Sequence, residues 1–168
     1  MRMSRRPCCI DANILFDFIA GGIIDFLFRM PYDFHIIDIV TDEISKTYSV
    51  SDLQRFGLVI LELDEETVLE IDSLREGHPG LSLQDKSVFT VSRNLGMMIL
   101  SNDGPLRELA GGSEIEYHGT IWLLEELVGS GNLSPRDAAA ALRAMLRENR
   151  WLPLPECERL IKKWEFEK

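Results

Sequence analysis

Apolar and polar residues follow two different periods along the chain. Short runs of apolar and β-branched residues predict buried strands at residues 7–10, 34–40, 58–63, 97–101 and 115–117. Between these runs, apolar residues recur three or four positions apart, which is the period of an amphipathic helix. Strands that alternate with helices predict an α/β protein with a mainly parallel central sheet and helices on both faces.

The end of the chain has a different pattern. Residues 129–132 are rich in Gly, Ser and Asn and predict a linker, and the stretch Ser134-Pro135-Arg136-Asp137 predicts the start of a helix. A second amphipathic segment follows two prolines. We therefore expect residues 1–133 to form the main domain and residues 134–168 to form a helical hairpin packed on the same domain.

Length and composition place the chain in the ordinary globular class. It has 168 residues, of which 45% are hydrophobic and 27% are charged, so one domain with one core is expected. The formal net charge of −10 is unfavourable for binding nucleic acid. Residues 134–168 are locally basic, however, with eight Lys and Arg against six Asp and Glu.

This asymmetry permits a phosphate-facing segment on an acidic body. If RNA binds, the candidate phosphate contacts are Arg107, Arg143, Arg147 and Arg150. The last three also have the spacing of an ordinary solvated helix face. The tryptophans have helical spacing too, which favours core or interface packing over base stacking; they are Trp122, Trp151 and Trp164.

The cysteines and the apolar segments indicate the cellular compartment of the protein. Cys8 and Cys9 are neighbours in a predicted strand and point to opposite faces, as small buried side chains in a reducing compartment do. The first apolar run carries Asp11 and Asp17, which excludes a signal-peptide core. No segment has the apolar length of a membrane span. We expect a cytoplasmic protein with no membrane contact.

Four acidic residues lie at the boundaries between predicted elements. Asp11 and Asp103 each follow a strand and precede a helix, while Glu43 and Asp85 lie in first helical turns. In parallel α/β folds such positions meet at one edge of the sheet. Carboxylates that crowd together raise one another's pKa or bind a cation, and oxygen ligands suit Mg²⁺ or Mn²⁺. The chemistry that this set predicts is phosphodiester hydrolysis by a metal-activated water.

Each acid also has a structural interpretation. Asp11 can cap the helix that it precedes, and Asp85 has capping-box spacing with Ser82. Asp42 could replace Glu43 as the ligand. Two further residues, Asn13 and Ser101, lie two positions from the aspartates and are placed to orient ligands or waters.

These residues bring the chain close to a known family. The sequence resembles the PIN-domain nucleases, particularly the small toxin-like (VapC-like) ribonucleases of toxin–antitoxin pairs. The family's Asp-x-Asn after a strand matches Ile10-Asp11-Ala12-Asn13, and its helix-starting Glu matches Thr41-Asp42-Glu43-Ile44. Its third acid matches Leu81-Ser82-Leu83-Gln84-Asp85, and its Ser-x-Asp matches Ser101-Asn102-Asp103. The later Gly-Thr of the family matches His118-Gly119-Thr120.

The resemblance implies a Rossmann-like fold and a ribonuclease that depends on Mg²⁺ or Mn²⁺, with an RNA substrate. Asp11, Glu43, Asp85 and Asp103 would be its catalytic and metal-binding residues. It also implies a homodimer and an antitoxin protein as a partner. The alternative is a catalytically idle PIN-fold module that acts through protein or RNA contacts. A phosphatase or receiver domain is disfavoured because no Asp-x-Asp occurs at Asp11.

Overall fold

A five-stranded parallel sheet forms the centre of the protein. The structure is a computed structural model and describes residues 4–148 and 151–167. The strand order is β3-β2-β1-β4-β5, and every neighbouring pair is parallel, which confirms the predicted α/β class. The strands are β1 (Arg6–Ile10), β2 (Tyr32–Ile37), β3 (Val59–Leu61), β4 (Met98–Leu100) and β5 (Tyr117–His118).

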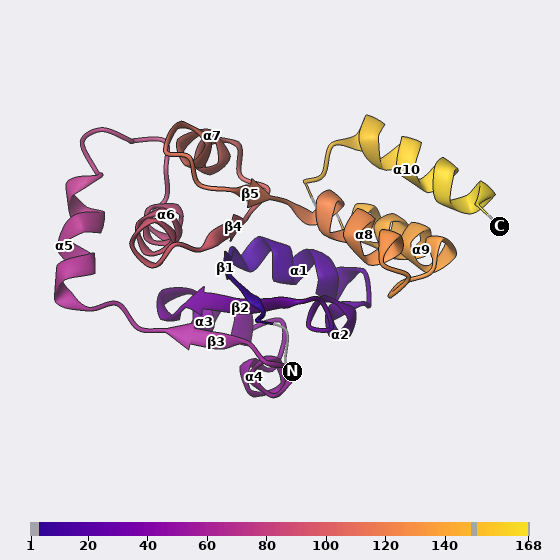
Figure 1. Ribbon diagram of the computed structural model, residues 1–168, viewed down its shortest axis with the longest axis horizontal. Helices are drawn as coiled ribbons and strands as arrows, with labels where there is room; N and C mark the ends of the chain where they lie inside the picture. The colour runs from indigo at the N-terminus through magenta and orange to yellow at the C-terminus, as the bar shows by residue number, and fades with distance from the viewer. Residues whose placement is uncertain (1–3, 149–150, 168) are drawn as a thin grey trace.

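Helices cover both faces of this sheet. One core cluster joins alternate strand residues, such as Cys8 and Ile10, to α1, α2, α8, α9 and α10. The other joins Cys9 to α6 and α7, as expected for side chains that alternate across a strand. Figure 1 shows α5, α6 and α7 at one side of the molecule and α8, α9 and α10 at the other. The helices are α1 (Ala12–Ala20), α2 (Ile24–Leu27), α3 (Thr41–Ser45), α4 (Val50–Phe56), α5 (Glu65–Ser73), α6 (Leu83–Leu95), α7 (Gly104–Gly112), α8 (Thr120–Gly129), α9 (Pro135–Arg147) and α10 (Leu154–Phe166).

Side-chain caps fix where several helices begin. The side chains of Asp11, Asp64 and Asp103 accept hydrogen bonds from backbone N–H groups in the first turns of α1, α5 and α7. Ser82 and Asp85 form a complete capping box on α6, as their spacing predicts. The strands therefore lead directly into capped helices, which places capping acids at the end of the sheet where strands finish.

Some predicted boundaries differ from the observed ones. The run at 34–40 is a strand only to Ile37, because residues 38–40 form a 3-10 turn in which the Thr41 hydroxyl donates to the Asp38 carbonyl at 2.8 Å. The sequence predicts a helix from about Gly104 to Ala110 that Gly111 and Gly112 end, whereas the observed helix continues through Gly112. A Cβ on Gly111 would lie 3.3 Å from the Tyr117 ring, so tertiary packing against that ring accounts for glycine here.

The C-terminal hairpin shares the main core. Trp164 on α10 and Met145 on α9 are buried in the same cluster as β1. The end of α1 meets α9 closely, because a Cβ on Gly21 would lie 2.8 Å from the Met145 methyl carbon. The domain division at residue 133 stays a prediction. Among the described residues, no helix has the length and apolar character needed to cross a membrane.

Candidate active site

The site lies where the strand order of the sheet reverses. From β1 the chain moves outward through β2 and β3, and it then returns to place β4 on the other side of β1. In open α/β sheets the crevice beyond the strand ends at this switch point is the usual ligand site. Asp11 follows β1 and Asp103 follows β4, so both flank it. The Asp11 N–H donates to the Leu100 carbonyl at 2.8 Å, which extends the pairing of the two strands to the site.

A buried hydroxyl joins the two aspartates. Ser101 is fully buried, and its Oγ donates to Asp11 Oδ2 at 3.0 Å. Ser101 Oγ also accepts a hydrogen bond from the Asp103 N–H at 3.0 Å. Ser101 therefore fixes the Asp11 carboxylate relative to the start of α7.

Both aspartates also cap helices. Asp11 Oδ1 accepts from the Asn13 N–H at 3.3 Å, and Asp103 Oδ1 accepts from the Leu106 N–H at 2.8 Å. Each cap uses Oδ1 alone. Capping therefore holds each carboxylate in place and is compatible with binding a ligand through the remaining lone pairs.

The electrostatic environment of Asp11 disfavours its charge. Burial is the largest cause that raises the pKa of its carboxyl, and the charges of Asp85 and Asp103 raise it further. Hydrogen bonds from the Asn13 N–H and the Ser101 hydroxyl act in the opposite direction. A half-buried carboxylate near two other acids is a favourable environment for a cation.

The other two predicted acids are arranged differently. Asp85 Oδ2 accepts from the Ser82 hydroxyl at 2.6 Å and the Ser82 N–H at 3.1 Å, while its charge still acts on Asp11. Glu43 is exposed and, rather than Asp42, lines a cavity of about 460 Å³ together with Asn13 and Lys46. The structure thus brings Asp11 and Asp103 to one cavity, leaves Asp85 near enough for its charge to act on Asp11, and places Glu43 on an adjoining cavity.

Asn13 lines both this cavity and a smaller one of about 250 Å³ at the switch point. The smaller cavity, which we call the acidic cavity, is lined by Asp11, Asn13, Asp17, Asn102, Asp103, Gly104 and Trp151. It brings Asp11 and Asp103 to a common space beyond the ends of β1 and β4.

A divalent cation fits the donor chemistry of this cavity. Among residues 4–148 and 151–167, no three His, Cys, Asp or Glu side chains converge closely enough to ligate a single ion. Mg²⁺ requires less, because it is commonly held by one or two carboxylates and keeps several waters. Asp11 and Asp103 are the pair that could hold such an ion. The predicted set of four ligands stays a prediction.

A buried polar network that the sequence analysis missed supports the wall of the acidic cavity. Asp17 on α1 is only 2% exposed, and its Oδ2 accepts from the Thr120 hydroxyl at 2.5 Å and the Asn102 amide at 2.9 Å. The Asn102 amide also donates to Thr120 Oγ1 at 2.9 Å, and its Oδ1 accepts from the Thr120 N–H at 2.9 Å. The network ties α1, the β4–α7 connection and α8 together. A Cβ on Gly119 would lie 2.4 Å from Asn102 Oδ1, so a larger residue there would displace the amide.

A sequence signal for this network exists. Asp17 interrupts the apolar stripe of its helix, and an acid on a core-facing helix position needs hydrogen-bond donors. The Gly-Thr pair of the family motif contains one of them, Thr120. The sequence alone does not show that these positions meet.

The predicted arginines occupy different environments. Arg107 lines a third cavity of about 290 Å³ and places its guanidinium 5.1 Å from the centre of the Tyr117 ring. Arg143 is paired with Glu165 on α10, with its Nη2 2.6 Å from Oε1. Arg147 is exposed at the end of α9, and Arg150 lies outside the described residues. Arg107 alone of the described three lines a cavity next to the acids.

The tryptophans also differ. Trp164 is buried, as predicted, and Trp122 is partly buried and stacks on His118 with ring centres 3.7 Å apart. Trp151 is 96% exposed, so the prediction of core packing is wrong for this residue, while interface packing stays a prediction. Residues 151–153 form neither helix nor strand, so helical spacing does not govern the burial of Trp151.

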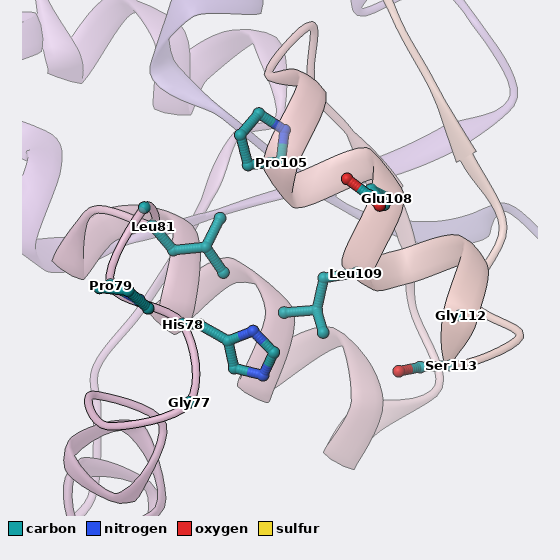
Figure 2. Close-up of a pocket in the computed structure, with 10 residues that line it drawn as sticks. Gly77, His78, Pro79, Leu81, Pro105, Glu108, Leu109, Gly112 and Ser113 are labelled. Carbon is teal, nitrogen blue, oxygen red and sulfur yellow. The ribbon is translucent and has the colours of Figure 1, made fainter.

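A further cavity lies away from the acids. It has a volume of about 500 Å³ and is bounded by the loop at residues 77–81 and by α7. Figure 2 shows His78 and Leu81 of the loop facing Leu109 on α7. None of the four predicted acids lines it, so cavity size does not identify the candidate active site.

Comparison with known proteins agrees with this fold. A family model described as PIN domain matches residues 8–166. Among solved structures, PAE2754 from Pyrobaculum aerophilum has 16% identity and a TM-score of 0.51, over 77% of this chain and 99% of that chain. A PilT N-terminus domain protein from Sulfolobus solfataricus has 13% identity and a TM-score of 0.49, over 71% and 92% of the two chains. A chain of a toxin–antitoxin complex from Klebsiella pneumoniae has 19% identity and a TM-score of 0.46, over 57% and 86%.

No curated protein sequence matches the chain. The family model nevertheless spans nearly its whole length, and the parallel sheet agrees with the structure from Pyrobaculum aerophilum. The protein therefore belongs to the PIN-domain family, whose members are in general nucleases.

Proposed function

We propose that the protein is a divalent-metal-dependent endoribonuclease of the toxin-like PIN type. The observation that carries the proposal is the Asp11–Ser101–Asp103 arrangement at the switch point, where a half-buried carboxylate lies near two other acids. A fold that needed these residues only as caps would have no requirement to bring them together. An ion-binding role explains both the crowding and the cavity.

Each residue of the site has a separate role in this proposal. Asp11 and Asp103 hold the ion and stay oriented through Ser101 and their capping bonds. Asp85 adds negative charge near Asp11, and Glu43 adds a carboxylate to the wall of the adjoining cavity. When bound, Mg²⁺ or Mn²⁺ supplies a water of lowered pKa and neutralises charge on the phosphate oxygens. Lys46 is a cationic side chain that lines the cavity of about 460 Å³ beside Glu43 and can contact a phosphate.

The partners follow from the resemblance to toxin-like PIN ribonucleases. We propose RNA as the substrate, an antitoxin protein as the inhibitor, a homodimer as the assembly and the cytoplasm as the location. The residue motifs quoted above support these assignments.

An idle binding module is the second candidate. Two observations favour it: no three described acids converge on one point, and helix capping accounts for a contact of each aspartate. In that case Asp11 and Asp103 would bind no metal and the fold would work through its surfaces.

Calorimetric titration with Mn²⁺ separates the two candidates. We expect the chelator-stripped protein to bind Mn²⁺, and both Asp11→Asn and Asp103→Asn to lose most of this binding. Cleavage of a labelled single-stranded RNA should fall by more than about 10²-fold in either variant. Asn is as good a cap as Asp, so neither helix start is lost.

Asp64→Asn is the matched control, because it makes the same change at the cap of α5. It should leave Mn²⁺ binding and cleavage unchanged. An unmutated protein that binds no Mn²⁺ and cuts no RNA would favour the idle module instead.

A further inference from the structure

Trp151 occupies an unusual place beside the candidate active site. Its side chain is 96% exposed, yet it lines both the acidic cavity and the adjacent cavity of about 290 Å³. Asn102 lines both cavities as well. The indole thus stands between the acids and a second binding space.

The second space is lined by aromatic rings; we call it the aromatic cavity. His118 and Trp122 form one wall as a parallel stack, with an angle of 12° between the rings. Pro153 and Ile121 add apolar surface. A flat ligand with an aromatic face suits such a cavity, because stacking on indole and imidazole rings needs no sequence-specific hydrogen bonds.

The polar groups of the aromatic cavity suit the edge of a nucleobase better than a second phosphate. Arg107 supplies hydrogen-bond donors, and Glu125 and Glu156 supply acceptors. Two carboxylates would repel a phosphate in this space, whereas they accept hydrogen bonds from an exocyclic amino group such as that of cytosine. A protein partner could also cover an exposed indole, but the adjacency to the acids favours a ligand that reaches both cavities.

We propose that Trp151 and the aromatic cavity bind one unpaired nucleobase of single-stranded RNA, next to the phosphate that a cation bound by Asp11 and Asp103 would hold. The assignment of that phosphate rests on the proposed nuclease function, whereas the base-binding role of Trp151 can be tested without cleavage. A base with an exocyclic amino group is favoured over uracil. Trp151 is a substrate-binding residue in this proposal and takes no part in the chemical step.

The first experiment measures binding without cleavage. The full-length protein carries Asp103→Asn, and fluorescein-labelled C6 and U6 oligoribonucleotides are the probes in fluorescence anisotropy. Trp151→Leu should weaken binding by roughly 5- to 150-fold, which corresponds to the loss of one stacked base. Trp151→Phe should retain most of the affinity because it keeps an aromatic face. The melting temperature should not change, because the indole is exposed.

The matched control is Phe166→Leu. Phe166 is 85% exposed at the far end of α10, so its substitution removes an exposed aromatic ring away from both cavities. We expect no change in oligonucleotide affinity. An equal loss in Phe166→Leu and Trp151→Leu would overturn a specific role for Trp151.

The base preference is tested by the ratio of C6 to U6 affinity. Both probes have pyrimidine rings, and only cytosine carries an exocyclic amino donor. C6 should bind more tightly, and Glu125→Ala with Glu156→Ala should abolish the difference. Equal binding of the two probes to the parent protein would overturn the assignment of the carboxylates as base acceptors.

Cleavage assays then distinguish failure of this inference from failure of the proposed function. In the otherwise unmutated protein, Trp151→Leu should raise KM for RNA and leave kcat nearly unchanged. Cleavage that is fully independent of Trp151 would reject the base-binding cavity and keep the nuclease. Binding that depends on Trp151 in a protein that cuts no RNA would keep the cavity and reject the nuclease. A change in oligomeric state with unaltered RNA binding would show that Trp151 belongs to a protein interface.

Discussion

Two regions of the molecule use the same local device in opposite environments. Asp11, at the end of β1, and Asp64, at the start of α5, both cap a helix by accepting a backbone N–H. Burial, together with the charges of Asp85 and Asp103, raises the pKa of Asp11. Asp64 is exposed, and hydrogen bonds from the side chain and backbone of Thr67 lower its pKa. The cap is a property of the local sequence, whereas the sign of the pKa shift is a property of the surroundings.

This difference separates a site from a structural motif. A capping aspartate in solvent gains from its hydrogen bonds and has no reason to attract a cation. A capping aspartate that is half-buried near other acids is less stable as an anion, and a bound cation would relieve that cost. The following predictions test whether the edge of the sheet differs from α5 in this way.

The largest effect is expected at Asp17, the buried acid of α1 that lines the acidic cavity. Thr120→Val removes the hydroxyl that donates to this carboxylate and keeps the volume of the side chain. Loss of a hydrogen bond inside this buried network should lower the free energy of unfolding by about 2–3 kcal/mol, as measured by urea denaturation. Thr67→Val is the control beside exposed Asp64 and should cost far less. Equal losses in the two variants would contradict the contrast between the regions.

Ser101→Ala should have the next largest effect. The variant removes the donor to Asp11 Oδ2 and the acceptor for the Asp103 N–H, at a cost of about 1–2 kcal/mol in unfolding free energy. It should also raise the pKa of Asp11 further, because the Ser101 hydrogen bond lowers it. Metal-dependent cleavage should fall by roughly 10- to 100-fold, as for other residues that orient ligands. Unchanged activity in a folded Ser101→Ala protein would speak against this orienting role.

Asp11→Asn and Asp64→Asn should change stability with opposite signs in chelator-treated protein at pH 7. Folding raises the pKa of Asp11, so stability from this group is complete below about pH 4 and is lost as pH rises through the raised value. The side chain that Asp11→Asn introduces cannot ionise, so the variant does not lose this stability at pH 7. Its Tm should be higher, by about 2–4 °C for each kcal/mol of unfolding free energy recovered.

Folding lowers the pKa of Asp64, so its contribution is present above about pH 4 and is lost as pH falls. Asp64→Asn should therefore lower Tm slightly at neutral pH. Calorimetric scans between pH 3 and 8 check both variants, and both differences should shrink toward pH 3. A lower Tm for Asp11→Asn at pH 7 would argue against repulsion among the acids.

The smallest effect concerns the coupling between the acids. Asp103→Asn should lower the pKa of Asp11 because it removes one of the charges that raise it. Carboxyl carbon chemical shifts, followed by NMR during an acid titration without metal, report this change. The pKa of Asp64 should stay constant in the same spectra. A constant pKa for Asp11 would mean that burial alone accounts for its shift.

Much of the fold could be predicted from the chain. The alternation of strand and helix patterns predicted the parallel sheet, and the spacing of Ser82 and Asp85 predicted their capping box. The candidate acids were found because they lie at strand ends and helix starts. Predictions failed where local signals are weak: the strand at 34–40 ends early in a 3-10 turn, and Trp151 lies in an irregular connection outside the core.

The sequence by itself determined the features that depend on near neighbours. A helix cap involves residues two or three positions apart, and the Ser-Asn-Asp order puts the Ser101 hydroxyl next to the Asp103 N–H. Only the tertiary structure decided which of these features meet. The Ser101 bond to Asp11 spans 90 residues, and the Thr120 bond to Asp17 spans 103. Such contacts depend on β4 pairing with β1 at the reversal of strand order, because strand order is set by packing of the whole sheet.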